Sequence, residues 1–267
     1  MRGYIRYFKT MLITNLQYKT AAIAGICTQF FWGFLQIFIY QAFYEGAGQD
    51  VPMDFQNLVT YVWLQQALFA LIYMRNKDSE LTKSIKNGTV AYELVRPYNL
   101  YIWWYIKCIS KKLAQVFLRM FPVIILAFCL PEPYCLALPA SVSSFLMSLI
   151  TLILGTLILV AITVIMQTII FFTYEDKGVN GIFYTFAELL SGLTLPIPLL
   201  PDILQSIAYF LPFRLIGDLP FRVYSGDIPL AESFENLGFQ AFWLVALVLI
   251  GVALMRKATK KICIQVG

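Results

Sequence analysis

The sequence contains no histidine and few charges, and both shortages limit what the chain can do. Without histidine it lacks the commonest general base and the commonest metal ligand. A Ser-His-Asp triad and an HExxH zinc motif are excluded for the same reason. Charged residues make up 13% of the chain, whereas soluble domains carry about 25%. We therefore expect neither a hydrolase of these kinds nor a soluble protein.

Several functional motifs are also missing. There is no GxxxxGK[ST] loop, so we expect no P-loop ATP hydrolysis by this chain. Neither a filter-like loop nor a matching pair of Gly- or Pro-interrupted spans is present, which disfavours channels and inverted-repeat transporters. The net charge of +5 is too small and scattered for nucleic-acid binding. These absences leave a passive membrane body that depends on energy supplied elsewhere.

Cysteine is scarce and shows no CxxC pairing. The five cysteines are interpreted as free thiols, and only Cys129 and Cys135, which flank a Pro-Glu-Pro turn, lie where they could bridge. We expect no cleaved signal peptide, because polar and basic residues precede the first apolar run and no small-residue cleavage site follows it.

Long apolar stretches, in contrast, are abundant. Hydrophobic residues make up 60% of the chain and aromatic residues 16%. A bilayer-spanning helix needs about 20 apolar residues. We predict an all-α membrane protein with one transmembrane domain over residues 1–267 and six spanning helices. The six stretches are 20–43, 56–74, 113–130, 142–173, 178–195 and 239–255.

The distribution of basic residues predicts the orientation of these six stretches. With a cytoplasmic N-terminus, eighteen of the twenty Lys and Arg residues fall on the inner side. Only Arg214 and Arg222 fall outside. This bias follows the positive-inside rule, so both termini are predicted to be cytoplasmic. The setting that we expect is the plasma membrane of a bacterial cell.

Residues 1–19 have the pattern of an amphipathic helix. Ile5, Phe8 and Leu12 recur at helical spacing, and Arg2 and Arg6 lie on the opposite side. Such a helix lies in the membrane interface with its basic face toward lipid headgroups. A disordered basic tail is the alternative.

The longest predicted cytoplasmic connection contains a compact segment at 76–97. Asp78 and Glu80 begin a predicted helix, two lysines end it, and Gly88 follows. Acids first, bases last and glycine just beyond the end are concordant helix signals. Pro97 prevents the helix from continuing. The segment is either a docking element for a partner or a structural elbow packed on its own helices.

Residues 196–229 are apolar yet interrupted by prolines, chiefly Pro196, Pro198, Pro201 and Pro212. This combination favours a re-entrant helical hairpin in the outer leaflet, because irregular backbone at membrane depth must be buried in protein or line a wet cavity. A fully extracellular loop is the alternative.

Glu188 is the one acid placed well within a predicted span. A charge near the bilayer centre costs at least about 2.5 kcal/mol, so such residues are candidates for function. A structural role, a place on the transport route and proton coupling all remain open. Arg119 is the basic candidate partner, although it lies near the cytoplasmic end of its own span.

Two runs of residues resemble those of type-two ABC exporter (ABC-2 type) permeases. The first is Ile85-Lys86-Asn87-Gly88-Thr89-Val90-Ala91-Tyr92-Glu93-Leu94-Val95-Arg96-Pro97. It is similar to the I-x-x-G-x-(I/V)-x-x-x-L-x-R-P stretch after the second span of that family. The second comprises Ser191-Gly192, Pro196, Pro201, Leu211-Pro212-Phe213, Pro220 and Tyr224-x-Gly226. It resembles the family's re-entrant region before the last span.

The resemblance implies a division of labour. The chain would form a transport route with a second permease, identical or related, above two copies of a cytoplasmic ABC ATPase. That ATPase would bind ATP and Mg²⁺, and this chain would bind no cofactor. The segment 76–97 would be the coupling helix in a groove of the ATPase. Its implied contact residues are Asp78, Glu80, Lys83, Ile85, Gly88, Tyr92, Glu93 and Arg96.

Two other functions remain open from the sequence. One is a membrane-bound immunity or binding protein that holds a peptide without transport, and the other is a channel or gradient-driven transporter without an ATPase. A stable ATPase partner distinguishes the permease from both. The cargo is not specified, although the many aromatic residues favour a hydrophobic or amphipathic one.

Overall fold

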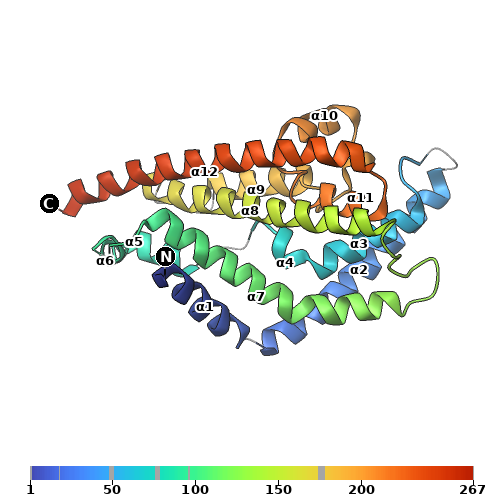
Figure 1. The fold of residues 1–267 in the computed structure, drawn as a ribbon, viewed down its shortest axis with the longest axis horizontal. Coiled ribbons are helices and arrows are strands. Elements are labelled where there is room, and N and C mark those ends of the chain that lie inside the picture. Colours follow the sequence, from blue (N-terminus) through green and yellow to red (C-terminus); the bar gives the residue numbers. More distant parts are fainter. Residues whose placement is uncertain are drawn as a thin grey trace.

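Figure 1 shows the computed structural model, which describes residues 2–17, 19–47, 51–75, 79–95, 97–173 and 178–266. All regular elements in these ranges are helical, which confirms the predicted all-α class. They are α1 (Arg2–Leu16), α2 (Lys19–Ala47), α3 (Phe55–Ala67), α4 (Phe69–Ile72), α5 (Ser79–Lys86), α6 (Ala91–Leu94), α7 (Leu100–Phe128), α8 (Val142–Thr173), α9 (Gly178–Leu190), the 3-10 helix η1 (Ile197–Leu199), α10 (Asp202–Phe210), α11 (Asp218–Ser225) and α12 (Leu230–Val266).

Helix α8 is the central helix of the fold. Its most apolar window has a mean hydropathy of 2.8, and 72% of that window is buried by other parts of the chain. Helices α2 and α12 are also long and apolar enough to cross a membrane, yet only 22% and 17% of their windows are buried. They therefore present broad apolar faces outward, which lipid or another protein must cover.

The predicted spans agree with the helices to different degrees. The stretch 142–173 coincides with α8, and those at 20–43 and 239–255 lie within α2 and α12. The stretch 113–130 largely overlaps the longer helix α7, which begins at Leu100. Among the described residues, three helices are long and apolar enough to span a membrane. The count of six spans stays a prediction.

Two of the predicted stretches are not continuous helices in the structure. The stretch 56–74 is divided into α3 and α4 at Leu68, whose φ of −101° and ψ of 11° leave the helical range. The stretch 178–195 is helical only to Leu190, because Gly192 adopts a φ of +79° that turns the chain. The turn thus comes before Pro196, the first residue after the predicted stretch.

Lys112 explains how α4 can end inside the protein. Its side chain, only 3% exposed, extends from α7. The ammonium donates to the carbonyl oxygens of Ala70 and Tyr73 at 3.2 and 3.0 Å. A cation at a helix C-terminus satisfies carbonyls that have no partner in the helix and opposes the helix dipole.

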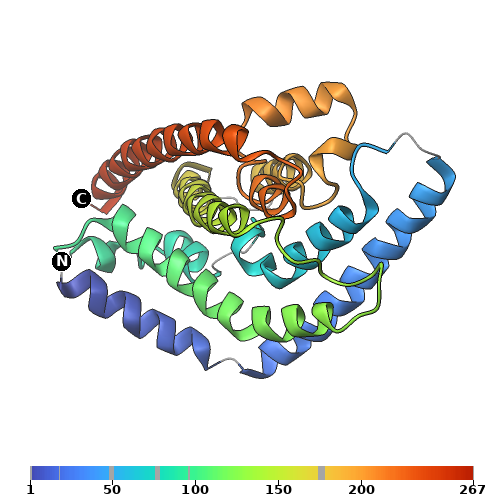
Figure 2. The same ribbon diagram turned by 45° about the vertical axis from the view of Figure 1, so that its right-hand side comes forward.

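The two ends of the molecule differ in composition. Both chain termini lie at one end together with α5 and α6, whereas α11 and the α7–α8 connection lie toward the other (Figures 1 and 2). Exposed basic side chains occur at the first end, on α5 and over residues 256–260 of α12. The side of the membrane on which this end lies stays a prediction.

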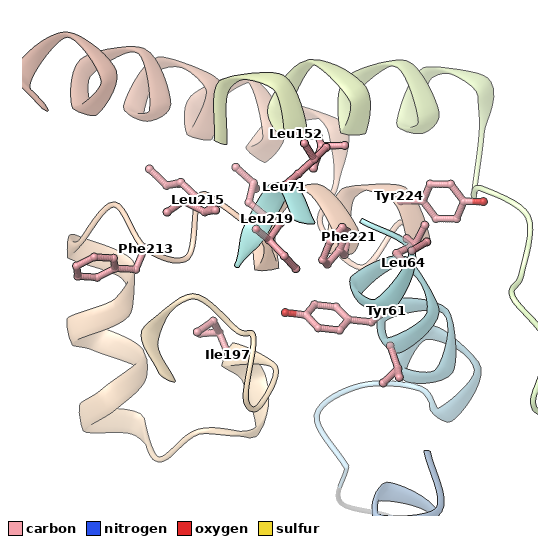
Figure 3. Packing of buried hydrophobic residues seen from close by; sticks show 14 of the residues in the cluster. Tyr61, Leu64, Leu71, Leu152, Ile197, Phe213, Leu215, Leu219, Phe221 and Tyr224 are labelled. Carbon is pink, nitrogen blue, oxygen red and sulfur yellow. The ribbon is translucent and has the colours of Figure 1, made fainter. Parts of the chain in front are cut away.

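The main core joins α8 to the segment that follows α10. Figure 3 shows side chains of α3, α4 and α8 converging with Leu215, Leu219 and Phe221. The close approach requires Gly155, because a Cβ there would lie 2.7 Å from the carbonyl oxygen of Leu215. Gln240 of α12 bridges the two segments, because its side-chain amide donates to the carbonyl oxygens of Thr151 and Leu215 at 2.9 and 2.8 Å.

We expect Gly155→Ala to lower the free energy of unfolding by about 1–3 kcal/mol, because the added methyl forces two backbones apart. Gly238 in α12 is the matched control, since nothing lies within 4 Å of a Cβ placed there. Gly238→Ala should be neutral or stabilising by up to about 1 kcal/mol. Thermal unfolding in detergent measures both, and equal midpoints for the two variants would contradict this packing.

Candidate docking elbow and buried polar network

Helices α5 and α6 meet at a sharp turn, and we call residues 79–95 the elbow. Helix α5 ends where Asn87 donates its backbone N–H to Lys83 at 2.9 Å and Gly88 takes a φ of +71°. The N–H of Val90 then bonds back to the carbonyl of Ser84 at 3.1 Å. A glycine in the left-handed region is the usual end of a helix, so the predicted helix stop at Gly88 is confirmed.

The inner face of the elbow is fixed to the helix bundle. Leu81, Ile85 and Val90 are 2%, 4% and 1% exposed and pack in a second core with residues of α7, α8 and α12. Trp104, fully buried in that core, donates its indole N–H to the carboxylate of Glu93 at 2.9 Å. Its ring stacks on Phe171 of α8 at 5.7 Å. The elbow is therefore a rigid part of the fold.

The outer face of the elbow is open. Tyr92 and Val95 are 76% and 85% exposed, and Lys83 and Lys86 of α5 are also exposed. A Cβ at Gly88 would meet nothing within 4 Å in the described parts of the chain. An aromatic ring and a valine held in solvent by a rigid element are features of a protein-docking surface.

The residues predicted as ATPase contacts are divided between the inner and the outer face of the elbow. Lys83, Gly88 and Tyr92 lie on the outer face, Glu93 is half-buried, and Ile85 is buried. Ile85 thus anchors the elbow and does not face outward. Asp78 and Arg96 lie outside the described residues, and Glu80 belongs to α5 but its side chain is not described.

An aromatic cluster, missed by sequence analysis, joins α1 to the base of the elbow. The ring of Tyr7 stacks on Trp103 at 3.5 Å, and Tyr98 stacks on the same indole at 4.9 Å. The hydroxyl of Tyr4 accepts a hydrogen bond from the N–H of Asn99 at 3.2 Å. Helix α1 is therefore attached to the start of α7. The spacing of aromatic residues in both segments was the available signal.

Glu188 forms an ion pair with Arg75, not with Arg119. The guanidinium of Arg75 lies 3.4 Å from the carboxylate, and their side chains are 44% and 16% exposed. Arg75 follows α4, and the early end of α4 brings it beside α9. The partner suggested from the sequence was therefore wrong, because Arg75 had been assigned to the cytoplasmic loop.

The proline-rich segment closes around a buried charge, Asp218. Its carboxylate has no exposed surface and accepts a hydrogen bond from the N–H of Ile197 at 3.1 Å, and the hydroxyl of Tyr61 lies 3.4 Å from it. Arg222 lies 3.5 Å away and also pairs with Asp227. Burial raises the pKa of the Asp218 carboxyl, and the guanidinium of Arg222 opposes this shift.

The two arginines that break the positive-inside pattern both lie in this network. Arg214 is 5% exposed, donates to the side-chain oxygen of Asn236, and lies 4.2 Å from the centre of the Tyr209 ring. Arg222 is 12% exposed and doubly paired. Both arginines interact with other side chains inside the protein. Their positions therefore give little information on which side of the membrane their segment lies.

The four prolines singled out in the sequence mark the turns of this segment. Pro196 and Pro201 immediately precede η1 and α10, and Pro198 lies inside η1. Pro212 is buried in the bend that follows α10. None of the cysteines described is bonded, and Cys129 and Cys135 are free thiols.

These features describe a polytopic helical protein with an elbow packed on the bundle at one end and a buried polar network toward the other. The family described as ABC-2 family transporter protein matches residues 16–265. Since the match covers nearly the whole chain, the protein belongs to this family and is a membrane protein of the ABC-2 permease type. Among individually curated proteins, none matches the sequence.

We expect Asp218→Ala to lower the free energy of unfolding by about 3 kcal/mol, because Arg222 loses a buried counter-charge and the N–H of Ile197 its acceptor. The control is Glu235→Ala, an exposed acid whose loss should change stability by about 0.5 kcal/mol or less. Detergent unfolding curves compare them. Similar midpoints would show that the Asp218 network does not hold the segment.

Proposed function

We propose that this chain is the membrane-spanning permease subunit of an ATP-driven ABC exporter. It forms a translocation route with a second permease, identical or related, and is coupled to two copies of a cytoplasmic ABC ATPase. ATP and Mg²⁺ belong to that ATPase, and no catalytic step belongs to this chain. The observation that carries the proposal is the elbow, which is anchored from inside and open on its outer face.

The outer face has the chemistry of a docking surface for another protein. Tyr92 and Val95 offer an apolar contact area, and Lys83 and Lys86 of the same elbow are exposed. A partner groove with an apolar floor and acidic rim complements this surface. Aromatic residues at the centre of such contacts contribute most of the binding energy.

The inner face provides a path for force. Movement of the outer face is passed to Glu93, from there to the indole of Trp104 in α7, and through the stacked ring of Phe171 to α8. Packed side chains deform little, so a displaced elbow displaces these two helices with it. A flexible loop would absorb the same push.

The membrane setting follows from the same proposal. The elbow and both termini face the cytoplasm, α1 lies at the inner lipid interface, and residues 196–229 re-enter from the outer leaflet. The membrane is the plasma membrane of a bacterial cell, and transport is outward. Glu188, paired with Arg75 between α4 and α9, is the candidate residue on the route.

Affinity purification in mild detergent, from cells that express the neighbouring genes, tests the assembly. We expect a P-loop ATPase at one copy per permease chain, and the same preparation reveals whether a second permease is present. Recovery of the chain alone, without ATPase activity, would contradict the proposal. It would favour a binding protein or a gradient-driven transporter.

The elbow makes a sharper prediction. Tyr92→Ala and Val95→Asp remove outer-face contacts and should reduce permease-stimulated ATP hydrolysis at least about tenfold, with normal expression. Leu138→Asp is the matched control: Leu138 is 77% exposed in the α7–α8 connection, far from the elbow. If both elbow variants retain full stimulation, the elbow is not the coupling site.

Glu188 is tested in the same system. Glu188→Gln should reduce export while expression stays normal, and Arg75→Gln should act in the same direction because the two residues form one ion pair. The double variant should then lose less than the sum of the single effects. Unchanged export in Glu188→Gln would remove this residue from the route.

A further inference from the structure

A cavity of about 430 Å³ lies between α2, α3, α4 and α7. Its walls carry four glutamines and one arginine, namely Gln29, Gln36, Gln65, Gln66 and Arg119. The volume falls within the range of roughly 300–1,000 Å³ found for small-molecule sites. Gln29 and Gln36 belong to a helix that is long and apolar enough to span a membrane. Polar side chains in such a helix are costly and usually serve function.

Gln29 is the member of this set that the fold itself does not use. It is 5% exposed, and neither its amide nitrogen nor its amide oxygen has a hydrogen-bond partner among the described residues. The other glutamines are engaged: Gln66 donates to Gln36 at 3.0 Å, and Gln65 donates to the carbonyl of Leu193. A buried amide without partners is rare, and it points to a ligand that supplies them.

Arg119 gives the cavity its charge. Among the described residues that line it, Arg119 is the one that carries charge. Its guanidinium lies against α2 at Gly25, where a Cβ would approach the guanidinium carbon to 2.5 Å. The absent side chain of Gly25 thus makes room for a cation at the cavity wall. A guanidinium in a partly enclosed site favours carboxylate or phosphate.

The cavity continues onto an apolar surface. Trp32, which lines it, is 51% exposed, and on the same helix Phe31, Phe38 and Ile39 are 66%, 54% and 57% exposed. A ligand with its head in the cavity would therefore meet apolar side chains where it leaves. This combination of polar interior and apolar surroundings matches an amphiphile better than a free ion.

We propose that this cavity binds an amphiphile whose anionic head reaches Arg119 and Gln29 and whose apolar tail lies along the exposed face of α2. The head must both donate and accept hydrogen bonds to satisfy the two ends of the Gln29 amide. Such a molecule is either a lipid of the bilayer or a separate acidic amphiphile brought as cargo. The proposed binding site does not depend on ATP coupling. Either the binding site or the coupling elbow can therefore be disproved while the other proposal holds.

Binding is measured on the purified full chain in an uncharged maltoside detergent. Lysophosphatidate is titrated while tryptophan fluorescence is recorded, because Trp32 lines the cavity. The matched probes are a monoacylglycerol of the same chain length and glycerol phosphate. We expect lysophosphatidate to bind at least about tenfold more tightly than either, because only it carries both head charge and tail. Equal affinity for the three probes would overturn the proposal.

Three variants separate a ligand site from a structural feature. Gln29→Leu should weaken lysophosphatidate binding at least about tenfold and yet raise the thermal midpoint by roughly 2–4 °C, because it removes a buried amide without partners. Arg119→Gln should reduce binding to the level of the monoacylglycerol. Lys257→Gln, which removes an exposed charge on α12, should bind like the native chain. A lower midpoint for Gln29→Leu would show a structural role and contradict the proposal.

The source of the ligand is identified by extracting lipids from the purified protein. An acidic phospholipid that is retained by the native chain and lost from Gln29→Leu identifies a bilayer lipid. An empty native site that binds the added probe identifies a separate amphiphile, and both results support the site. If Gln29→Leu instead dissociates a permease pair without changing probe binding, a second copy covers the cavity and the proposal is wrong.

Discussion

Backbone groups that are freed where a helix ends inside an apolar body must find partners within the protein. Helices α4 and α9 both end in this way, since Ile72 and Ser191 are each 2% exposed. Side chains help to meet the requirement: Lys112 donates to carbonyls at the end of α4, Tyr61 donates to the carbonyl of Gly192 after α9 at 2.9 Å, and Asp218 accepts from the N–H at the start of η1. These buried polar groups permit two short, interrupted helices where continuous spans were expected.

Helix α7 connects most of the features that matter for the proposed function. Trp103 holds α1, Trp104 holds the elbow, Lys112 holds the end of α4, and Arg119 reaches the cavity. Because all four project from one continuous helix, a shift of the elbow is shared by the interfacial helix and the cavity. In the proposed cycle, α7 is therefore the lever between the ATPase and the membrane.

The sequence predicted the features that depend on local chemistry. The stretch 142–173 and the stop at Gly88 were correct, because hydropathy and glycine conformation act over a few residues. It did not predict the break at Leu68, which neither proline nor glycine marks. The pairing of Arg75 with Glu188 and the orphan amide of Gln29 depend on which helices are neighbours. Periodicity in one segment does not contain that information.

The elbow separates two selective pressures on a few residues. Leu81, Ile85 and Val90 are constrained by the interior, whereas Tyr92 and Val95 lie outside that core and are largely exposed. Outer positions can therefore drift without loss of folding. Duplicated genes encoding such chains could diverge in partner choice through few substitutions, and cells that carry several related transporters could keep their ATPases from exchanging subunits.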